Sequence, residues 1–461
     1  MTAPVVRRTV SSLKVRNFRL YFFGQMVSLS GTWMQSVAQA WLVLKLTGSG
    51  TALGLVVALQ FLPVLLLGPL GGLVADRCDN RRLLYATQTS AGLLALALGL
   101  LVSFDVVRLW MVFALAGGFG LVNAVDSPAR QTFVHEMVGS DELPNAVTLN
   151  SVMVNLARAV GPAVAGALIA TVGLGPCFLI NAGSYLAVLT ALGLMRADEL
   201  QPTIAQPRAK GQIREGFRYV RATPALSTPL LMMAVIGTLA YEFGVILPLM
   251  ARFTFHGDAG TYGLMSSCMG VGSVVGGLYA ASHRRVGATA LALNAAAFGV
   301  VLLMAAAAPN LAVELVALFL IGVASIGFLS LGNATLQLTT APEMRGRVMA
   351  LWSVAFLGST PVGGPVVGWI GQNLGPRYGL GVGGLAALAA GALAYRSLAR
   401  IGSRAPIEAA AHIEAAAHIE ARATAAPPAP APLPPADTAI PPETWPAPAE
   451  LALRGAGADR R

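Results

Sequence analysis

Long apolar segments recur along the whole chain, and they constrain its fold more than any other feature of the sequence. A helix of about 20 apolar residues crosses the roughly 30 Å hydrocarbon core of a bilayer, and several segments reach that length. Only 11% of the residues are charged and the mean hydropathy is +0.67, whereas soluble domains carry about 25% charged residues. Backbone polar groups must be paired inside a bilayer, which favours helices for such segments. The sequence therefore predicts an all-α membrane protein.

Hydropathy places twelve transmembrane helices, and a charged linker divides them into two groups of six. The predicted spans are 18–44, 51–75, 83–104, 107–127, 145–172, 175–195, 226–250, 259–281, 287–307, 311–335, 347–371 and 376–398. We therefore expect two six-helix bundles, at 18–195 and 226–400. The remaining parts are an N-terminus (1–17), a linker (196–225) and an Ala- and Pro-rich tail (401–461), which we expect to be disordered because of its low-complexity composition.

The basic residues indicate how the chain is oriented. The net charge is +10, and most Lys and Arg residues fall in small groups between spans on alternate sides of the membrane. Cytoplasmic loops carry such an excess, so both termini and the linker should be cytoplasmic. This distribution explains the charge better than nucleic-acid binding does. We expect a multi-pass protein of the bacterial cytoplasmic membrane, surrounded by lipid and acting as a monomer.

Polar residues recur at steps of three and four on two of the predicted helices, so each helix has one polar face. Unpaired polar groups are costly in lipid, and both faces should turn toward protein or water. They favour a hydrophilic substrate cavity; the alternative is hydrogen bonding between helices of a static bundle. The cavity candidates, together with Tyr241 from the seventh span, are Gln25, Thr32, Gln35, Gln39, Ser151 and Asn155.

Arg158 continues the polar face of the fifth span, roughly 16 Å from its cytoplasmic start at 1.5 Å per residue. An arginine at that depth costs about 2.5–3.5 kcal/mol, so it must face the protein interior and find a partner or water. Gly161, Pro162 and Gly166 follow directly. They allow close helix approach and a bend, which predicts a hinge at a helix interface.

Glu242 is the one acidic residue near the centre of a predicted span. Burial favours the neutral form of a carboxylic acid, which makes this residue the leading candidate for a proton carrier, with Arg158 as the accompanying base. Two other interpretations stay open. Glu242 could neutralise Arg158, or it could accept a purely structural hydrogen bond.

A further group of charges lies at the cytoplasmic ends of the second to fourth spans. Gly72 permits close helix packing, Asp76 can accept hydrogen bonds from a helix N-terminus, and nearby arginines can bridge to carboxylates. We interpret the group as a breakable gating latch; the alternative is that the arginines only set topology. Its members are Gly72, Asp76, Arg77, Arg81, Arg82, Asp126 and Arg130.

Three stretches carry a resemblance to a known family: GGLVADRCDNRR, DSPARQTFVHEMVGSDELPNAVTLNSVMVNLARAVGPAVAG and MRGRVMALWSVAFLGSTPVGGPVVGW. The chain resembles the major facilitator superfamily, and within it the drug:H⁺ antiporter branch of transmembrane secretion effectors. The first stretch is similar to the superfamily's loop signature, although Asp79 and Asn80 depart from it and Ala281 replaces the matching acid of the second half. The resemblance implies that the latch stabilises an outward-facing state, and that the stretch from Gly161 to Gly166 favours export.

The sequence therefore predicts a secondary transporter that exports a small amphipathic compound, such as a drug, siderophore or metabolite, by proton antiport with rocking halves. The alternatives are a proton-coupled importer or facilitator of the same fold, or a membrane sensor that transports nothing. The chain has no catalytic or nucleotide-binding motif and no metal-ligand spacing, so we expect no enzyme, no metal and no cofactor. The partners should be the small-molecule substrate and protons.

Overall fold

A computed structural model describes residues 11–201, 212–282 and 287–396. Over these ranges every regular element is a helix, which confirms the all-α prediction. The predicted tail at 401–461, the first ten residues and the central part of the linker lie outside the described residues. All the described helices belong to one compact unit that ends at Gly402.

The first half of the chain forms helices whose bounds agree with the predicted spans to within a few residues, except that the fourth span, predicted to end at residue 127, continues as helix to the reversal at Gly139. They are η1 (Ser11–Lys14), α2 (Arg16–Thr47), α3 (Gly50–Arg77), α4 (Asn80–Ser103), α5 (Leu109–Val172) and α6 (Leu174–Leu194). The fourth and fifth spans are joined in α5, where the chain reverses at Gly139. Gly139 has φ 68°, a left-handed conformation that glycine adopts without the steric cost of a Cβ.

The second half contains more breaks. Its elements are η2 (Ala197–Glu199), α7 (Gln212–Ala222), α8 (Pro224–Ala240), α9 (Phe243–Leu249), η3 (Met250–Thr254), α10 (Ala259–Ser282), α11 (Ala288–Ala306), α12 (Leu311–Thr339), η4 (Pro342–Met344), α13 (Arg345–Leu357), α14 (Thr360–Asn373) and a last helix, Pro376–Arg396. The seventh span breaks between α8 and α9, at Tyr241 and Glu242, and the eleventh breaks between α13 and α14, at Gly358 and Ser359.

Ten of the described helices are long and apolar enough to cross a membrane. One of them, α5, contains two of the predicted spans. The helix α2 is not among the ten, because its polar face lowers its hydropathy, yet its 32 residues are ample to cross a bilayer. With α2, the helices account for the twelve predicted spans.

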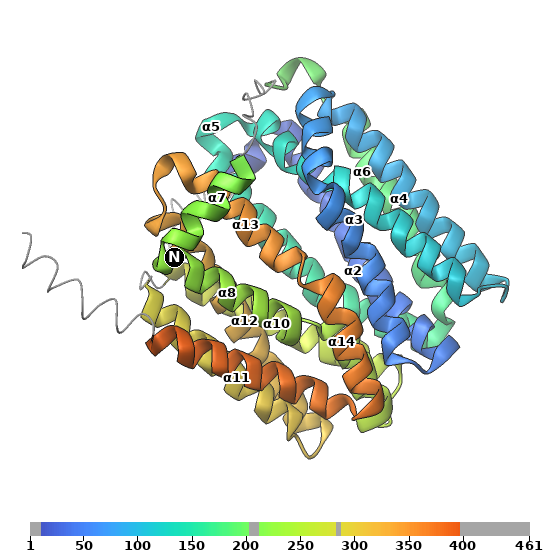
Figure 1. The fold of residues 1–461 in the computed structure, drawn as a ribbon. Coiled ribbons are helices and arrows are strands. Elements are labelled where there is room, and N and C mark those ends of the chain that lie inside the picture. The colour runs from blue at the N-terminus through green and yellow to red at the C-terminus, as the bar shows by residue number, and fades with distance from the viewer. Residues whose placement is uncertain (1–10, 202–211, 283–286, 397–461) are drawn as a thin grey trace, which may run out of the picture. The chain divides into compact units, whose positions relative to one another are not determined.

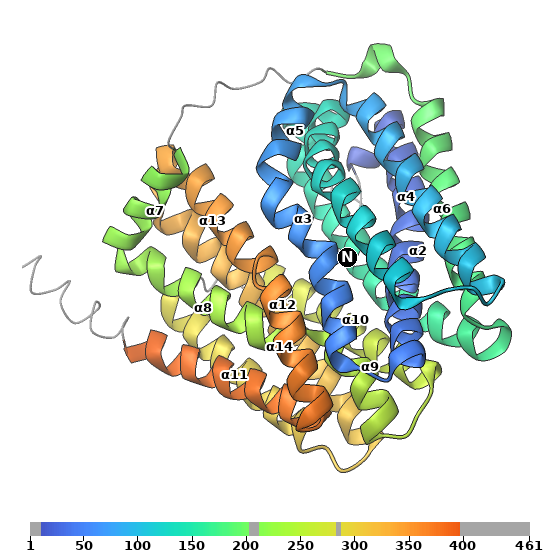
Figure 2. The same cartoon turned by 45° about the vertical axis from the view of Figure 1, so that its right-hand side comes forward.

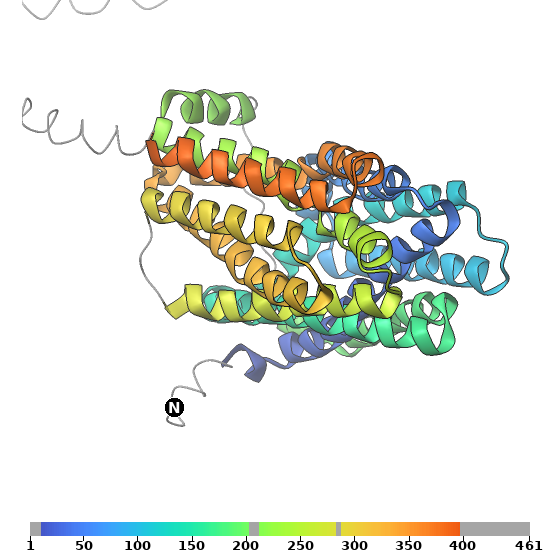
Figure 3. The ribbon, with the colours of Figure 1, turned by 90° about the horizontal axis from the view of Figure 1, so that it is seen from below.

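The spans run back and forth between two ends of the unit, which we name by the features that they carry. The linker side holds η1, the bend at Gly139 and α7, and the far side holds the turns at Gly48, Gly173 and Gly375. Figures 1 and 2 show the helices of the two halves close together near α9 and α14, on the far side, and spread apart toward α7 and the α5 bend. Figure 3 shows the helices of the second half (green to orange) lying beside those of the first half (blue to teal).

Glycines bring the two halves into backbone contact on the far side. A Cβ added to Gly54 of α3 would collide with the carbonyl of Gly364 in α14, and one added to Gly368 would collide with the carbonyl of Gly50. Between α5 and α10, a Cβ on Gly263 would lie 2.6 Å from the Pro162 oxygen. Such close approach is typical of small-residue interfaces in membranes. We call these two crossings the far-side seal.

Candidate functional site

Arg158 lies on α5 just to the linker side of the seal, where the two halves meet. A Cβ on Gly270 of α10 would lie 2.8 Å from the Arg158 backbone oxygen, so the second half packs directly against α5 here. The guanidinium carbon lies 5.2 Å from the centroid of the Trp33 ring of α2, a cation–π distance. The Nε atom is buried and has no hydrogen-bond partner.

The predicted hinge residues place this pair. Gly161 is buried, and a Cβ there would lie 2.6 Å from Cβ of Trp33 and 2.8 Å from the backbone oxygen of Ser30. The missing side chain therefore lets α5 pack tightly onto α2 one turn beyond Arg158. Gly166 has the same function toward α10, since its Cβ would lie 3.2 Å from Cα of Gly260.

The polar face of α5 leads from the linker side to Arg158. Ser151 is exposed, and Asn155 and Arg158 are partly exposed. The Ser151 hydroxyl donates to the Val147 carbonyl at 3.0 Å, and the Asn155 amide donates to the Ser151 carbonyl at 2.8 Å. Both side chains are thus held by their own helix, and neither bonds to a neighbouring helix.

The polar face of α2, unlike that of α5, contacts polar groups of another helix. The Gln35 carbonyl oxygen accepts from the Asn181 amide of α6 at 2.7 Å, and the hydroxyls of Thr32 and Tyr185 lie 3.4 Å apart. Gln25 and Gln39 are buried inside the protein, at 1% and 5% exposure. The structure therefore places this face against α6 and the interior of the first half, apart from the α5 face. Thr32 and Gln35 thus contact polar groups of α6, whereas the buried Nε2 atom of Gln25 has no partner, and the substrate cavity stays a prediction.

Glu242 lies at the break between α8 and α9 and is 4% exposed. Thr360, the first residue of α14, lies beside its carboxyl group, and the Oε1 atom has no hydrogen-bond partner. A Cβ on Gly363 would lie 2.7 Å from Oε1, and one on Gly364 would lie 3.6 Å from Oε2. Gly364 is therefore held between the Glu242 carboxyl group on one side and Gly54 on the other.

Tyr241 precedes Glu242, and its hydroxyl donates to the Ser325 carbonyl of α12 at 2.7 Å. Its ring packs against Phe243, Phe298 and Phe356, with centroids 5.4 to 6.2 Å apart. The ion pairs of the described residues do not include one between Arg158 and Glu242. The two central charges thus belong to separate environments in this conformation.

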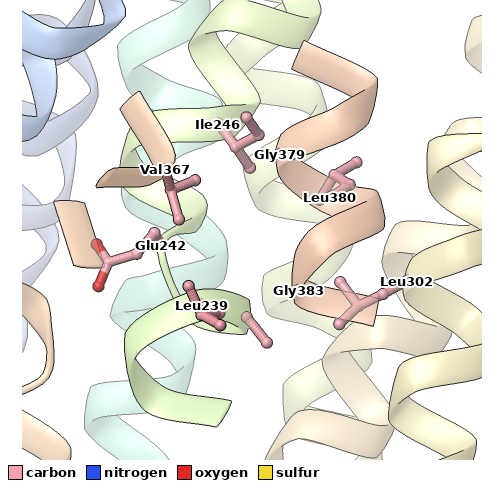
Figure 4. Close-up of a pocket in the computed structure, with 9 residues that line it drawn as sticks. Leu239, Glu242, Ile246, Leu302, Val367, Gly379, Leu380 and Gly383 are labelled. Carbon is pink, nitrogen blue, oxygen red and sulfur yellow. The ribbon is translucent and has the colours of Figure 1, made fainter. Parts of the chain in front are cut away.

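A small cavity of about 10 Å³ adjoins Glu242. Figure 4 shows that the other lining residues are apolar and that the Glu242 oxygens point away from them. The space is about that of one water molecule. It is therefore too small to hold an organic substrate.

The latch residues fall into separate groups. Asp126 is buried and forms an ion pair with Arg130, and its Oδ1 accepts from Thr87 at 2.7 Å and from Gln88 at 2.8 Å. The Arg81 guanidinium donates to backbone carbonyls at the end of α6, including that of Leu192 at 2.7 Å. It thus contacts the orphan carbonyls of a helix C-terminus, where a cation is favoured.

The other latch residues lie at the start of the loop between α3 and α4. Arg82 is exposed and lies 3.6 Å from Asp79, which caps α4. Asp76 is half-buried and Arg77 is exposed. The close approach of α3 to α5 occurs at Gly71, where a Cβ would collide with the carbonyl of Ala124; Gly72 itself is half-buried.

The sequence analysis did not predict three parts of this arrangement: the contacts of Asp126 with Thr87 and Gln88, the position of Thr360 beside Glu242, and the far-side seal. The far-side seal could have been predicted from the sequence. The sequences GTALG (50–54) and GPVVG (364–368) are both G-x-x-x-G motifs, which are typical of close helix crossings in membranes. The contacts of Asp126 with Thr87 and Gln88 could not, because these two look like ordinary polar residues of a helix start.

Comparison with known proteins assigns the family. The model of a family described as transmembrane secretion effector matches residues 8–424. The chain belongs to this family of the major facilitator superfamily. This secretion effector is therefore a multi-span membrane transporter of small molecules, and the twelve-helix fold predicted from the sequence is confirmed.

Curated relatives of the secretion effector include exporters. It is 27% identical to the staphyloferrin A transporter of Staphylococcus aureus over 260 residues, which is 55% of this chain and 64% of that protein. It is 26% identical to the multidrug efflux pump Tap of Mycolicibacterium fortuitum, over 75% of this chain and 86% of that one. The enterobactin exporter of Citrobacter koseri is 24% identical over 82% of this chain and 90% of its own.

Solved structures share the fold at low sequence identity. A bacterial homologue of the lysosomal transporter Spinster, crystallised in an inward-facing and unoccupied conformation, has a TM-score of 0.64 and 15% identity, over 87% of this chain and 99% of that one. The nucleoside transporter NupG has a TM-score of 0.67 and 13% identity, over 84% and 99%.

Proposed function

We propose that the chain is a secondary active exporter of small amphipathic compounds, driven by proton antiport and working by alternating access. The substrate binds between the halves, beside the polar face of α5. The linker side is the cytoplasmic side, because the basic loops gather there, and both termini are cytoplasmic. The relatives named as a multidrug efflux pump and an enterobactin exporter support outward movement of such compounds.

The observation that carries the proposal is the position of Glu242. A buried carboxyl group at a helix break near mid-membrane is an expected site for ion coupling. Here the carboxyl group contacts Gly363 and Gly364, and Gly364 also contacts Gly54 across the far-side seal. Gaining or losing a proton at Glu242 changes the charge directly behind the contact that closes the far side.

The conformation fits the first step of export. The halves contact each other through glycines on the far side, while on the polar face of α5 Ser151 is exposed and Asn155 and Arg158 are partly exposed. Substrate therefore enters from the cytoplasm in this state. Opening of the seal, with closure at the linker side, would release it outward.

Transport assays in proteoliposomes with an imposed pH gradient test this function. Glu242→Gln should abolish substrate accumulation that depends on the gradient, while substrate binding persists. The amide keeps the shape of the carboxylic acid but cannot take up and release a proton. Glu314→Gln is the matched control, since Glu314 is a buried acid of the same half, in the first turn of α12 on the far side. Normal gradient dependence in Glu242→Gln would exclude this residue as the coupling site.

The same assay separates export from the alternatives. Accumulation driven by an inward proton gradient in the direction opposite to proton flow supports antiport. Accumulation in the direction of proton flow would indicate a proton-coupled importer, and equilibration without accumulation would indicate a facilitator.

A further inference from the structure

Arg158 is a cation without a matching anion in the described part of the chain. Of the buried acids nearest in the fold, Asp126 is paired with Arg130 and also accepts from Thr87 and Gln88. Glu242 lies beside Thr360 and Gly363. The side chain of Arg158 is partly exposed, but its Nε atom is buried and has no hydrogen-bond partner. A buried polar group without a partner is disfavoured, so the environment of Arg158 is incomplete.

The groups around the guanidinium supply no negative charge. Trp33 presents its ring face, and Tyr241 uses its hydroxyl proton to bond Ser325. The backbone of α10 at Gly270 packs against the backbone oxygen of Arg158 and supplies no charge either. A guanidinium offers five donors in a planar fork that matches a carboxylate, and its Nε is among the donors left unused.

The polar face of α5 runs from Ser151 toward Arg158, which is itself partly exposed. Ser151 is exposed, Asn155 is partly exposed, and both are held by hydrogen bonds to their own helix. A solute arriving along this face meets Arg158 directly below the far-side seal. The aromatic ring beside the charge provides an apolar surface for the rest of the solute.

We propose that Arg158 determines substrate class: it binds a carboxylate of the transported compound, while Trp33 contacts the compound's apolar or aromatic part. This inference deepens the proposed function and rests on it. The substrates are then amphipathic carboxylic acids in their ionised form. Neutral amides of the same skeleton bind more weakly, and cationic amphipaths are repelled by the unpaired guanidinium.

Matched probes that differ in one group test the inference. N-dansyl-leucine carries a carboxylate, and N-dansyl-leucinamide replaces it with a neutral amide of nearly the same size. Naphthoylglycine and its amide form a second pair. Binding to the full chain in detergent at neutral pH is measured by energy transfer from tryptophan for the dansyl pair and by competition for the other pair.

A charge-assisted hydrogen bond that is lost on changing the acid to the amide weakens binding by about 10- to 100-fold. We therefore expect this preference for the acid in the wild-type protein and a preference within about twofold in Arg158→Gln. Arg158→Lys should retain part of the preference, since it keeps the charge without the planar fork. Arg108→Gln removes an exposed arginine and should leave the preference unchanged.

Equal binding of acid and amide to the wild-type protein would overturn the inference, as would failure of both acids to bind at millimolar concentration. An unchanged preference in Arg158→Gln would do the same. If Arg158→Gln does not fold, Arg158→Lys is used instead. A preference for the acid that is as strong in Arg158→Lys as in the wild-type protein would then overturn the inference. Proton coupling is measured separately: gradient-driven transport without a preference for acids refutes this inference alone, and a preference for acids without gradient dependence refutes antiport alone.

Discussion

The far-side seal gives the sharpest prediction, because a single methyl group should open it. In Gly54→Ala, the new Cβ would lie 2.7 Å from the Pro365 nitrogen and closer still to the Gly364 carbonyl. Ordinary carbon contacts lie at 3.4–4 Å, so the backbones of α3 and α14 must separate by about 1 Å. The atoms that block the methyl group are backbone atoms, which cannot turn aside as a flexible side chain would.

Forced overpacking of this kind typically costs about 1–3 kcal/mol. The cost falls on the conformation in which the seal is closed, because the two glycines separate when the far side opens. A difference of that size changes the ratio of the two conformations by about 5- to 150-fold. Gly54→Ala should therefore populate a far-side-open state that is minor in the wild-type protein.

Pulsed electron–electron double resonance measures this shift directly. Spin labels at Val106→Cys and Leu374→Cys report on the far side of the two halves, since both residues are exposed at far-side turns. The native cysteines, Cys78, Cys177 and Cys268, are first replaced by serine. Gly54→Ala should increase the population at longer distance.

Gly183→Ala is the matched control for the seal. It makes the same chemical change inside α6, at a position where a Cβ would meet open space. Its distance distribution should match that of the unsubstituted protein. The reasoning fails if Gly54→Ala folds normally and gives that same distribution, because the crossing would then tolerate a methyl group without opening.

Three further predictions concern charged residues. Asp126→Asn leaves the partly exposed Arg130 without its counter-charge and should lower the free energy of unfolding by about 1–3 kcal/mol, measured by chemical denaturation in detergent; an unchanged midpoint would show that the pair does not stabilise the fold. Asp76→Asn should impair transport without reducing the amount of protein in the membrane, as compared by transport assay and immunoblot, and wild-type transport would remove Asp76 from gating. Asp258→Ala should lower the free energy of unfolding by about 1 kcal/mol, because it removes the cap of α10. The hydrogen bond from the backbone N–H of Thr261 lowers the pKa of Asp258, so the stabilisation by the cap should be present above about pH 4 and be lost as the pH falls further. A stability difference between wild type and variant that persists in acid would contradict the capping role.

The positions of the helices could be predicted from the sequence because lipid enforces a simple rule. An apolar segment of sufficient length must be a helix, and a charged or glycine-containing turn must end it. The predicted spans 259–281 and 311–335 therefore agree with α10 and α12 to within four residues. The family resemblance of the three quoted stretches was confirmed as well, since such motifs depend on local spacing.

The helix breaks were harder to predict from the sequence than the helix positions. Pro361 lacks the N–H that would bond Leu357, which explains why the eleventh span breaks at Gly358 and Ser359. The break at Tyr241 and Glu242 has no glycine or proline at the break itself. Nothing in the local sequence requires it, and its position depends on packing against α14.

The partners of charged residues were the least predictable part of the site. Arg81 lies close to several acids in sequence but donates to the carbonyls of α6, 111 residues away along the chain. A helix C-terminus attracts cations whatever its sequence is. Hydropathy and motif spacing carry no information on such contacts, so the roles of the latch residues remain predictions for the transport assay.

The far-side seal also bears on how large a cargo the protein can pass. Its closest contacts are peptide backbone against peptide backbone, although the side chains of Leu249 and Val245 border the crossing of Gly50 and Gly368. A contact between helix backbones opens only when whole helices move apart. The width of the exit is then set by how far the halves rock, so a single transporter of this kind can accommodate molecules of very different girth.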